Sequence, residues 1–402
     1  MTDVLSEIGK PPILDLTRFE ADPASTLDEL RPHRIVHSER GIEIIGCELG
    51  HKLLADGRLR PMSARDFSSH GASPYIAEFV DKGVFLFMEP ERHKKIKSIF
   101  ARGFAGKQVL GSHGAINQTA NSLIDRLLEK GEADLVEDFT QRFAAESLCL
   151  VLGFPAADIP AFVDAALDLR HLVYVPIEPH ITKIELALDT LRDYAVGLLK
   201  ERRSNPGADF LSTLIAAADE QGRMTTDELV WGVVNLLLGG IDTTNFQLAS
   251  SLQHMIANNI WDKAAEDAAI REAAIQEAMR LSPVATMLGR IVHEPFNIDG
   301  VEFSIGADVK VNFVGAGRDP QAYDDPHAYR LDRKTPPFPL IFGNGVHTCI
   351  GKNLAWMELR TGVERLTARL TDLEFSAEPR MHAWTEAFFG PYTLPVKFRA
   401  RS

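Results

Sequence analysis

One segment, TDELVWGVVNLLLGGIDTTNFQLASSLQHMIAN at 226–258, constrains the fold of this 402-residue chain more than any other. Apolar residues recur with helical spacing and occupy nearly every side of its middle part, which is typical of a helix buried on all sides. At 1.5 Å per residue, the helix would be about 50 Å long. A helix of this length needs a large body around it. We therefore expect a mainly α protein in which this helix crosses the core.

This long helix does not predict a membrane span. Its most apolar stretch, 229–241, contains Asn235 and ends at Asp242, whereas a bilayer span needs about 20 apolar residues. The N-terminus lacks the basic region and apolar core of a signal peptide. The cysteines are Cys47, Cys149 and Cys349. Because an odd, sparse set is typical of a reducing compartment, we expect a cytoplasmic protein.

The rest of the chain predicts more helices than strands. Helical spacing of apolar residues recurs in 113–130, 134–153, 157–169, 178–203 and 208–219. Short segments that predict strands are 34–46, 291–313 and 384–399, and a hairpin signal is present at Asp299–Gly300. We expect one domain over 1–402. Its helical part covers roughly 90–285 and 351–371, and its β-rich part covers roughly 10–85, 291–313 and 384–399.

The charge of the chain excludes some partners. The formal net charge is −13, which disfavours non-specific nucleic-acid binding, since that requires a basic face. The same charge disfavours anionic lipid. We therefore expect neither a nucleic acid nor a membrane as partner.

A single cysteine, Cys349, lies in the loop FGNGVHTCIG. Gly343, Gly345 and Gly351 flank it, and glycines permit positive φ and close approach of the backbone. A helix that begins just after the cysteine would direct free N–H groups at the sulfur and favour a thiolate. The loop therefore predicts an accessible, deprotonated sulfur.

Three interpretations of this cysteine fit the loop. It could be a buried structural thiol, a nucleophile with His347 as its base, or an axial ligand to heme iron. The second is disfavoured because a residue two positions away in a tight loop rarely points at its neighbour, and no third group is evident that would orient the base.

The long helix has a second unusual feature, the segment GGIDTT at 239–244. A glycine inside a helix costs about 1 kcal/mol relative to alanine, and a pair of them lets a flat group lie against the backbone. The threonine hydroxyls can bond back to helix carbonyls and widen the helix. A kinked core helix without a ligand is the alternative explanation.

Together these residues resemble the cytochrome P450 family. The loop fits the family's cysteine-ligand pattern F-G-x-G-x-H-x-C-x-G at every fixed position. The resemblance implies the mainly α P450 fold, with a large helical domain and a small β-rich region. It also implies heme b (iron protoporphyrin IX) as cofactor, with Cys349 as the metal ligand, and Asp242 with Thr243 as the acid–alcohol pair that supplies protons to dioxygen.

The same resemblance implies the activity. The enzyme would be a soluble bacterial monooxygenase, similar to the camphor-hydroxylating branch. It would insert one oxygen atom from O2 into a small hydrophobic substrate, by hydroxylation or epoxidation.

By resemblance, the heme lies between the cysteine loop and the long helix. The residues implied to contact it are Phe342, Gly239, Gly240, Gly343 and Gly351. The residues implied to hold its propionates are His93, Lys97, Arg290 and His347. Lys97 stands where the family usually has arginine, and lysine cannot bind a carboxylate in a bidentate way. The residues that resemble the family's structural salt-bridge network are Glu277, Arg280 and Arg333.

The substrate pocket also follows from the resemblance. Its implied lining residues are Leu236, Gly239, Ala285, Thr286, Met287, Phe388 and Phe389. Segments 61–85 and 168–180 are expected to form a mobile entrance. An apolar wall favours a small terpenoid, aromatic or steroid-like substrate. A polar anchor is expected from His171, Tyr174 or the 65–75 segment, without a choice among them.

Electrons must come from another protein, because the chain carries no second cofactor motif. The resemblance implies a 2Fe–2S ferredoxin and its NAD(P)H-dependent reductase. Segment 91–107 has six basic side chains and one acidic one, and together with Lys352 it would attract an acidic partner. A solvated basic helix is the alternative explanation of this segment. We expect a monomer.

Three other functions remain open. The chain could be a heme-thiolate isomerase, dehydratase or peroxygenase, for which turnover without an electron donor would be the sign. It could be a non-catalytic heme sensor, which would need neither the acid–alcohol pair nor a ferredoxin. It could also be a heme-free helical protein with an ordinary thiol.

Overall fold

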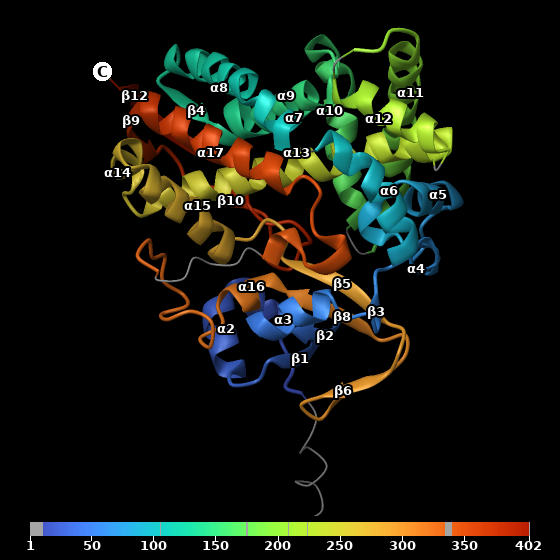
Figure 1. Ribbon diagram of the computed structural model, residues 1–402. Helices are drawn as coiled ribbons and strands as arrows, with labels where there is room; N and C mark the ends of the chain where they lie inside the picture. The colour runs from blue at the N-terminus through green and yellow to red at the C-terminus, as the bar shows by residue number, and fades with distance from the viewer. Residues whose placement is uncertain are drawn as a thin grey trace, which may run out of the picture.

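The long predicted helix is the axis of the molecule (Figure 1). The computed structural model describes residues 11–104, 106–173, 176–207, 209–222, 224–333 and 340–401, except the side chains of 106–108 and 221. Helix α13 spans Thr226–Ala257, and Thr225 and Glu228 form a capping box at its start. Most of its residues are buried. The helices packed against it include α9 (Gln141–Leu152), α11 (Ile181–Ser204), α15 (Ala268–Leu281) and α17 (Lys352–Arg369). The predicted core helix is therefore confirmed.

The other helices of the helical part surround this axis. They are α6 (Pro90–Gly103), α7 (Gly106–Gly111), α8 (His113–Leu128), α10 (Ile159–Asp168), α12 (Phe210–Gln221) and α14 (Trp261–Glu266). A π-helical turn at Val136–Thr140 precedes α9, and α9 ends at Gly153 in the left-handed conformation. The helices predicted between residues 113 and 219 are therefore present, with bounds that differ by a few residues.

A five-stranded sheet joins residues that are far apart in the sequence. Its strands are β1 (Ile35–Ser38), β2 (Gly41–Ile44), β3 (Leu59–Arg60), β5 (Met287–Val292) and β8 (Asp308–Asn312). Their order is β1-β2-β8-β5-β3, and only the β2–β8 pair is parallel. Ile42 is paired with Val309, which is paired in turn with Arg290. In Figure 1 the sheet lies at the end of the molecule away from α8 and α11.

Three smaller sheets complete the structure. One contains β4 (Glu132–Asp134), β12 (Pro395–Ala400) and β9 (Leu370–Phe375), and the others pair β10 (Arg380–Met381) with β11 (Pro391–Thr393) and β6 (Phe296–Ile298) with β7 (Val301–Phe303). The predicted hairpin turn is present between β6 and β7, where Asp299 and Gly300 have φ of 54° and 83°. Its arms are shorter than predicted because β5 and β8 pair with each other on either side of it.

The prediction that residues 10–85 are β-rich is wrong. Besides β1, β2 and β3, this segment contains α1 (Leu16–Ala21), α2 (Pro23–Leu30), α3 (Cys47–Leu54), α4 (Ala64–Ser69) and α5 (Pro74–Lys82). Four of these helices begin at good N-caps, namely Asp15, Asp22, Ser63 and Ser73. Capping residues and proline at the first helical position start short helices even where the apolar spacing is weak.

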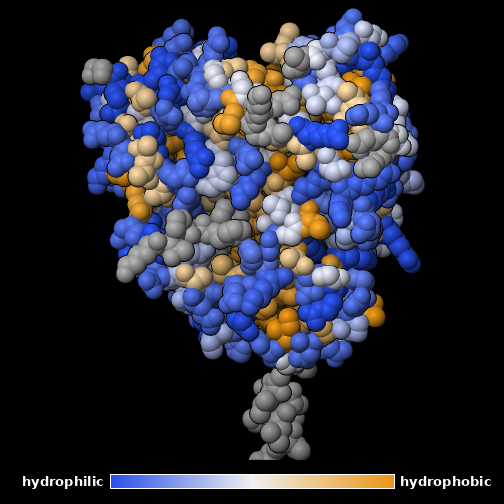
Figure 2. Space-filling model, viewed as in Figure 1, coloured by the Kyte–Doolittle hydropathy of each residue, from blue (hydrophilic) through white to orange (hydrophobic). Residues whose placement is uncertain are grey.

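The fold is mainly α, with the small sheet region that the resemblance implied. One core surrounds α13 and another lies against the five-stranded sheet. None of the helices in the described ranges is long and apolar enough to cross a membrane. On the face shown in Figure 2, apolar residues form small groups within a mostly hydrophilic surface. Because residues 35–60 and 287–312 complete one sheet, we propose that the chain forms a single domain. One further short helix, α16 (Phe313–Gly317), follows β8.

Candidate active site

The loop before α17 presents Cys349. Gly343 and Gly345 both have φ of 69°, in the region that side chains disfavour. The backbone turns back on itself, since Cys349 N–H donates to the carbonyl of Phe342 at 2.8 Å. A Cβ on Gly345 would lie 3.1 Å from Ala55. The glycines therefore allow a tight loop to pack against α3 with its cysteine turned inward.

The sulfur of Cys349 is placed in a mixed electrostatic environment. Burial raises the pKa of this thiol, whereas the backbone N–H groups of Gly351 and Lys352 and the charge of Lys97 act in the opposite direction. The predicted N–H donors at the start of α17 are thus present. On their own they do not outweigh burial, so a full thiolate requires a further cation. A metal ion bound to the sulfur supplies one and deprotonates it.

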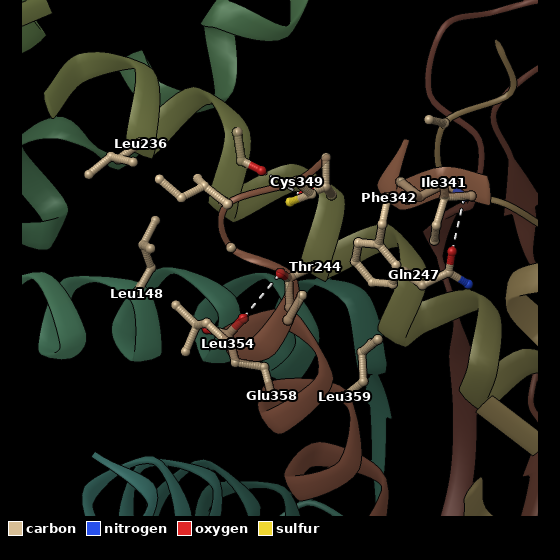
Figure 3. A pocket seen from close by; sticks show the side chains of 18 of the residues that line it. Leu148, Leu236, Thr244, Gln247, Ile341, Phe342, Cys349, Leu354, Glu358 and Leu359 are labelled. Atoms are coloured by element: carbon tan, nitrogen blue, oxygen red, sulfur yellow. Dashed lines mark hydrogen bonds between the residues drawn. The ribbon is translucent and has the colours of Figure 1, made fainter. Parts of the chain in front are cut away.

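A cavity of about 190 Å³ separates this loop from α13. Its walls are mostly apolar, as the close-up in Figure 3 shows around Leu236, Leu148, Leu354 and Leu359. Cys349 is accessible from this cavity. On the opposite wall a Cβ on Gly239 would meet no atom within 4 Å, whereas one on Gly240 would lie 2.8 Å from Leu148. The cavity therefore leaves open space against the helix backbone at Gly239, as a flat ligand requires.

His93, His347 and Arg290 lie close enough together for their charges to interact. Among the described residues, Nδ1 of His93 and Nη2 of Arg290 have no hydrogen-bond partner, whereas the His347 ring has a hydrogen bond with the backbone of Phe85. The rings of His93 and His347 lie 4.1 Å apart. Burial, aided by neighbouring cations, lowers the pKa of His93 to about 4 and that of His347 to about 3. At these pKa values both imidazoles are neutral near pH 7, so Arg290 supplies a positive charge and an unsatisfied donor beside two neutral rings. This arrangement fits an anionic ligand, and the propionates of heme supply such anions.

Lys97 lies close enough to His93 and His347 for its charge to lower the pKa of both histidines. Its Nζ donates to the carbonyl of Val346 at 2.9 Å and to the carbonyl of Thr348. The predicted role of Lys97 as a propionate partner stays a prediction.

The two residues of the acid–alcohol pair on α13, Asp242 and Thr243, contact different groups. Thr243 Oγ1 donates to the carbonyl of Gly239 at 2.7 Å, which is the back-bond expected from the sequence. Asp242 is 3% exposed, and its Oδ2 lies 3.1 Å from Nε of Arg170. Burial raises the pKa of Asp242 to about 6, with Arg170 acting in the opposite direction. Its Oδ1 has no partner among the described residues. This carboxyl is therefore able to gain and lose a proton near neutral pH.

Arg170 and Glu358 are two site residues that the sequence analysis missed. Glu358 lines the cavity from α17, and Thr244 Oγ1 donates to its Oε2 at 3.2 Å, the contact drawn in Figure 3. Burial raises the pKa of Glu358 to about 8. Its position nine residues after Cys349 in the predicted helix was the only available signal. Arg170 gave none, because its contact with Asp242 is purely tertiary.

The predicted substrate pocket is present only in part. Leu236, Gly239 and Ala285 line the cavity. The residues that do not line it are Thr286, Met287, Phe388 and Phe389. The Thr286 hydroxyl donates to the carbonyl of Glu386, and Phe389 stacks on Trp384 at 3.4 Å, so backbone pairing and ring stacking hold these side chains elsewhere. Met287 belongs to β5, and Phe388 forms an isolated bridge with Ala285.

The predicted polar anchors also differ from expectation. The ring of His171 stacks on that of His180 at 4.4 Å, and Tyr174 lies outside the described residues. A polar side chain that does line the cavity is Asn235, one turn before Gly239 on α13. Its polarity within an apolar helix is visible in the sequence, where it also argues against a membrane span.

The two segments predicted to form the entrance lie in contact. Ser73 Oγ donates to Glu185 at 2.6 Å, and Tyr75 OH donates to Asp189 at 2.8 Å. A Cβ on Gly71 would collide with the side chain of Glu178. Two side-chain hydrogen bonds therefore connect helix α11 with the start of α5.

The predicted structural network is built as a buried triad. Both carboxylate oxygens of Glu277 accept from Arg280, at 2.6 and 2.9 Å, and both accept from Arg333, at 2.8 and 3.0 Å. The Arg280 guanidinium also donates to the carbonyls of Gly317, Pro326 and Ala328. These contacts tie α15 to the segment that leads toward the cysteine loop.

Comparison with known proteins finds similar sequences and a similar fold among cytochrome P450 proteins. The chain is 29% identical to the cytochrome P450 monooxygenase PikC of Streptomyces venezuelae, over 97% of this chain and 95% of that protein. It is 27% identical to the mycinamicin IV hydroxylase/epoxidase of Micromonospora griseorubida, over 86% of each chain. The crystal structure of P450BioI with an acyl carrier protein superposes with a TM-score of 0.87 at 23% identity, covering 95% of this chain and 100% of that one.

A family model supports the same assignment. The model described as Cytochrome P450 matches residues 161–381, which is more than half of the chain. This match, together with relatives that span nearly the whole chain, agrees with the resemblance of the cysteine loop. The chain belongs to the cytochrome P450 family.

Proposed function

We propose that Cys349 ligates the iron of heme b in the cavity between its loop and α13, and that this P450 monooxygenase uses the site to oxidise a small apolar molecule. One observation carries this proposal. The accessible sulfur and the open backbone at Gly239 face the same cavity. When bound, a thiolate-ligated heme activates dioxygen and inserts one oxygen atom into a C–H or C=C bond.

The chain's own residues hold and enclose that group. His93, Arg290 and His347 would bind the propionates, because Nη2 of Arg290 and Nδ1 of His93 have no partner among the described residues and Arg290 carries the opposite charge. Phe342 lines the cavity beside Cys349 and shields it. The apolar walls exclude water, which strengthens each of these charged interactions.

Protons would be supplied by Asp242 and Thr243. A carboxyl with a pKa of about 6 is present in both protonation states near neutral pH. Arg170, on the side of Asp242 that bears Oδ2, holds the carboxyl in place. The Thr243 hydroxyl is fixed to the Gly239 carbonyl, so its oxygen is left as an acceptor toward the cavity.

The substrate we propose is a small hydrophobic molecule, terpenoid, aromatic or steroid-like, with one hydrogen-bonding group. The cavity walls are mostly apolar, and the Asn235 amide is a polar side chain that lines them. Asn235 precedes Thr243 by two helical turns, about 12 Å along the axis. A relative from Mycolicibacterium smegmatis is named as a steroid C26-monooxygenase, which is consistent with a steroid-like substrate.

The electron donor we propose is an acidic 2Fe–2S ferredoxin with an NAD(P)H-dependent reductase. Lys94 and Lys95 are exposed on α6, and Val346, in the cysteine loop, is 52% exposed. Arg92 is paired with Asp81 and Glu228, so part of the predicted basic segment is already neutralised. We further propose a monomer in the cytoplasm, where three free cysteines would stay reduced.

Turnover with labelled oxygen tests this function. Purified holoprotein would be screened against terpenoids and steroids for a spin-state shift, then supplied with ferredoxin, reductase, NADH and 18O-labelled O2. We expect one labelled oxygen atom in the product. Product formed without a donor would instead indicate an isomerase, dehydratase or peroxygenase. Binding without product, with reduction indifferent to ferredoxin, would indicate a sensor.

A further inference from the structure

His93 and Lys97 lie one turn apart on α6, yet they contact different partners. The ring of His93 faces the ring of His347 at 4.1 Å. Nζ of Lys97 donates instead to the carbonyls of Val346 and Thr348, on either side of His347 in the chain. Lys97 therefore contacts the backbone of the cysteine loop.

The carbonyl of Thr348 belongs to the peptide bond that leads into Cys349. The N–H of the same peptide bond donates to the carbonyl of Phe342 at 2.8 Å. Both polar groups of this peptide plane are therefore held, one by Lys97 and one by the loop itself. The Thr348–Cys349 peptide plane sets where the Cα of Cys349 lies. Because Lys97 holds the carbonyl of this plane, it helps to set the position of the sulfur.

Contacts that do not involve Lys97 hold the first half of the cysteine loop, at Asn344 and Gly345. Asn344 Nδ2 donates to the carbonyl of His51 at 2.9 Å, and Gly345 packs against Ala55. The second half carries the sulfur, and there Lys97 joins the loop to α6, a helix from a distant part of the chain. An ammonium is a compact charge with three rotatable donors, which suits two carbonyls at different angles. The charge also interacts with the Cys349 sulfur.

We propose that Lys97 is a positioning residue for Cys349, which clamps the peptide plane before the cysteine and places a positive charge beside the sulfur. This role rests on the proposed function, since it concerns the iron ligand. It differs from the propionate role implied by the resemblance, which concerns the carboxylates of the cofactor and not its iron. A positive charge near the site favours the reduced state of the iron, so Lys97 raises its reduction potential.

The test compares Lys97→Gln, Lys97→Arg and Lys95→Gln as holoproteins. Lys95→Gln removes the same charge from an exposed position on the same helix. Two readouts are measured: the ferric/ferrous potential, and amide hydrogen exchange in peptides covering 342–350 and 287–293. We expect Lys97→Gln to lower the potential and to speed exchange in 342–350 by about tenfold, as expected for loss of charge-assisted hydrogen bonds.

The control variants decide between the explanations. Lys97→Arg should recover most of both changes, and Lys95→Gln should leave both near wild type. Unchanged exchange in 342–350, with or without a change in potential, would overturn the proposal. So would faster exchange confined to 287–293, the strand of Arg290, because that result would indicate a propionate partner. The carbon-monoxide spectrum of each variant reports separately whether Cys349 is the ligand.

Discussion

The two walls of the cavity are built in different ways. The loop wall, 340–351, is shaped by glycines at positive φ and by backbone hydrogen bonds such as Cys349 N–H to Phe342. The helix wall, around 235–244, is regular helix, and its special properties come from side chains. Asp242 is buried with one oxygen unpaired, and Gly239 lacks a side chain where the cavity needs space. The difference teaches that backbone geometry sets the position of Cys349 on the loop wall. On the helix wall, the burial of the Asp242 side chain sets the pKa of its carboxyl.

The largest effect is expected on the loop wall. Cys349→Ala removes the proposed ligand, so monooxygenase turnover should fall to background, while the loop keeps its backbone hydrogen bonds. Turnover and circular dichroism would be measured together. A folded variant that retains wild-type turnover would show that the loop wall is not where the cofactor is held.

The next largest effect is expected from the acid of the helix wall. Asp242→Asn should lower turnover by about a hundredfold, the scale of general acid catalysis. Because proton supply requires the protonated carboxyl, wild-type turnover should fall as pH rises through about 6, the pKa of Asp242. The variant should lack this inflection. The same inflection in Asp242→Asn would assign the titration to another group.

Thr243→Ala should change the outcome of electron transfer more than its rate. Without the hydroxyl that is fixed to Gly239, protons reach dioxygen without control. NAD(P)H consumption should stay within about twofold, whereas product per NAD(P)H should fall about tenfold and peroxide should rise, on the scale of one lost catalytic group. Tight coupling in this variant would contradict the role of the alcohol.

A smaller effect tests whether the open space at Gly239 on the helix wall is needed for binding. Gly239→Val places two methyl groups into the open cavity and should lower heme content or substrate affinity about tenfold, which corresponds to about 1.4 kcal/mol. Gly197→Val is the matched control, because Gly197 is in α11 and a Cβ there also meets no atom within 4 Å. Equal losses in both variants would mean that only helix propensity had changed.

The smallest effect concerns Glu358, which links the two walls through Thr244. Its pKa of about 8 lies above the ordinary value of 4.5, so the folded state keeps a proton that the unfolded state releases. Its stabilising contribution is therefore lost as pH rises between these values, at up to about 1.4 kcal/mol per pH unit. Glu358→Gln should remove this loss in denaturant titrations at pH 5 and 8. Parallel pH dependence in both proteins would contradict a buried, protonated Glu358.

The sequence predicted the loop wall better than the rest of the site. The spacing of Gly343, Gly345 and Cys349 predicts a turn that only glycines accommodate, and local backbone geometry is encoded locally. The core helix was predictable for the same reason, from the apolar residues on all its sides. Arg170 and Glu358 were not, because each acts through one tertiary contact that no spacing reveals.

The errors have related causes. The short helices within 10–85 follow from caps such as Asp22 and Ser73 rather than from apolar spacing. Thr286 and Phe389 were placed in the pocket by resemblance, whereas pairing with the 386–387 backbone and stacking on Trp384 hold them elsewhere. The implied role of Lys97 toward a propionate stays a prediction, and its side chain also reaches two loop carbonyls.

The central claim is that Cys349, as a thiolate, binds the iron of a heme in this cavity. The most direct test is the absorption spectrum of the reduced holoprotein under carbon monoxide. A strongly red-shifted Soret band is the predicted result. A band typical of histidine ligation, or a protein that takes up no heme, would contradict the account.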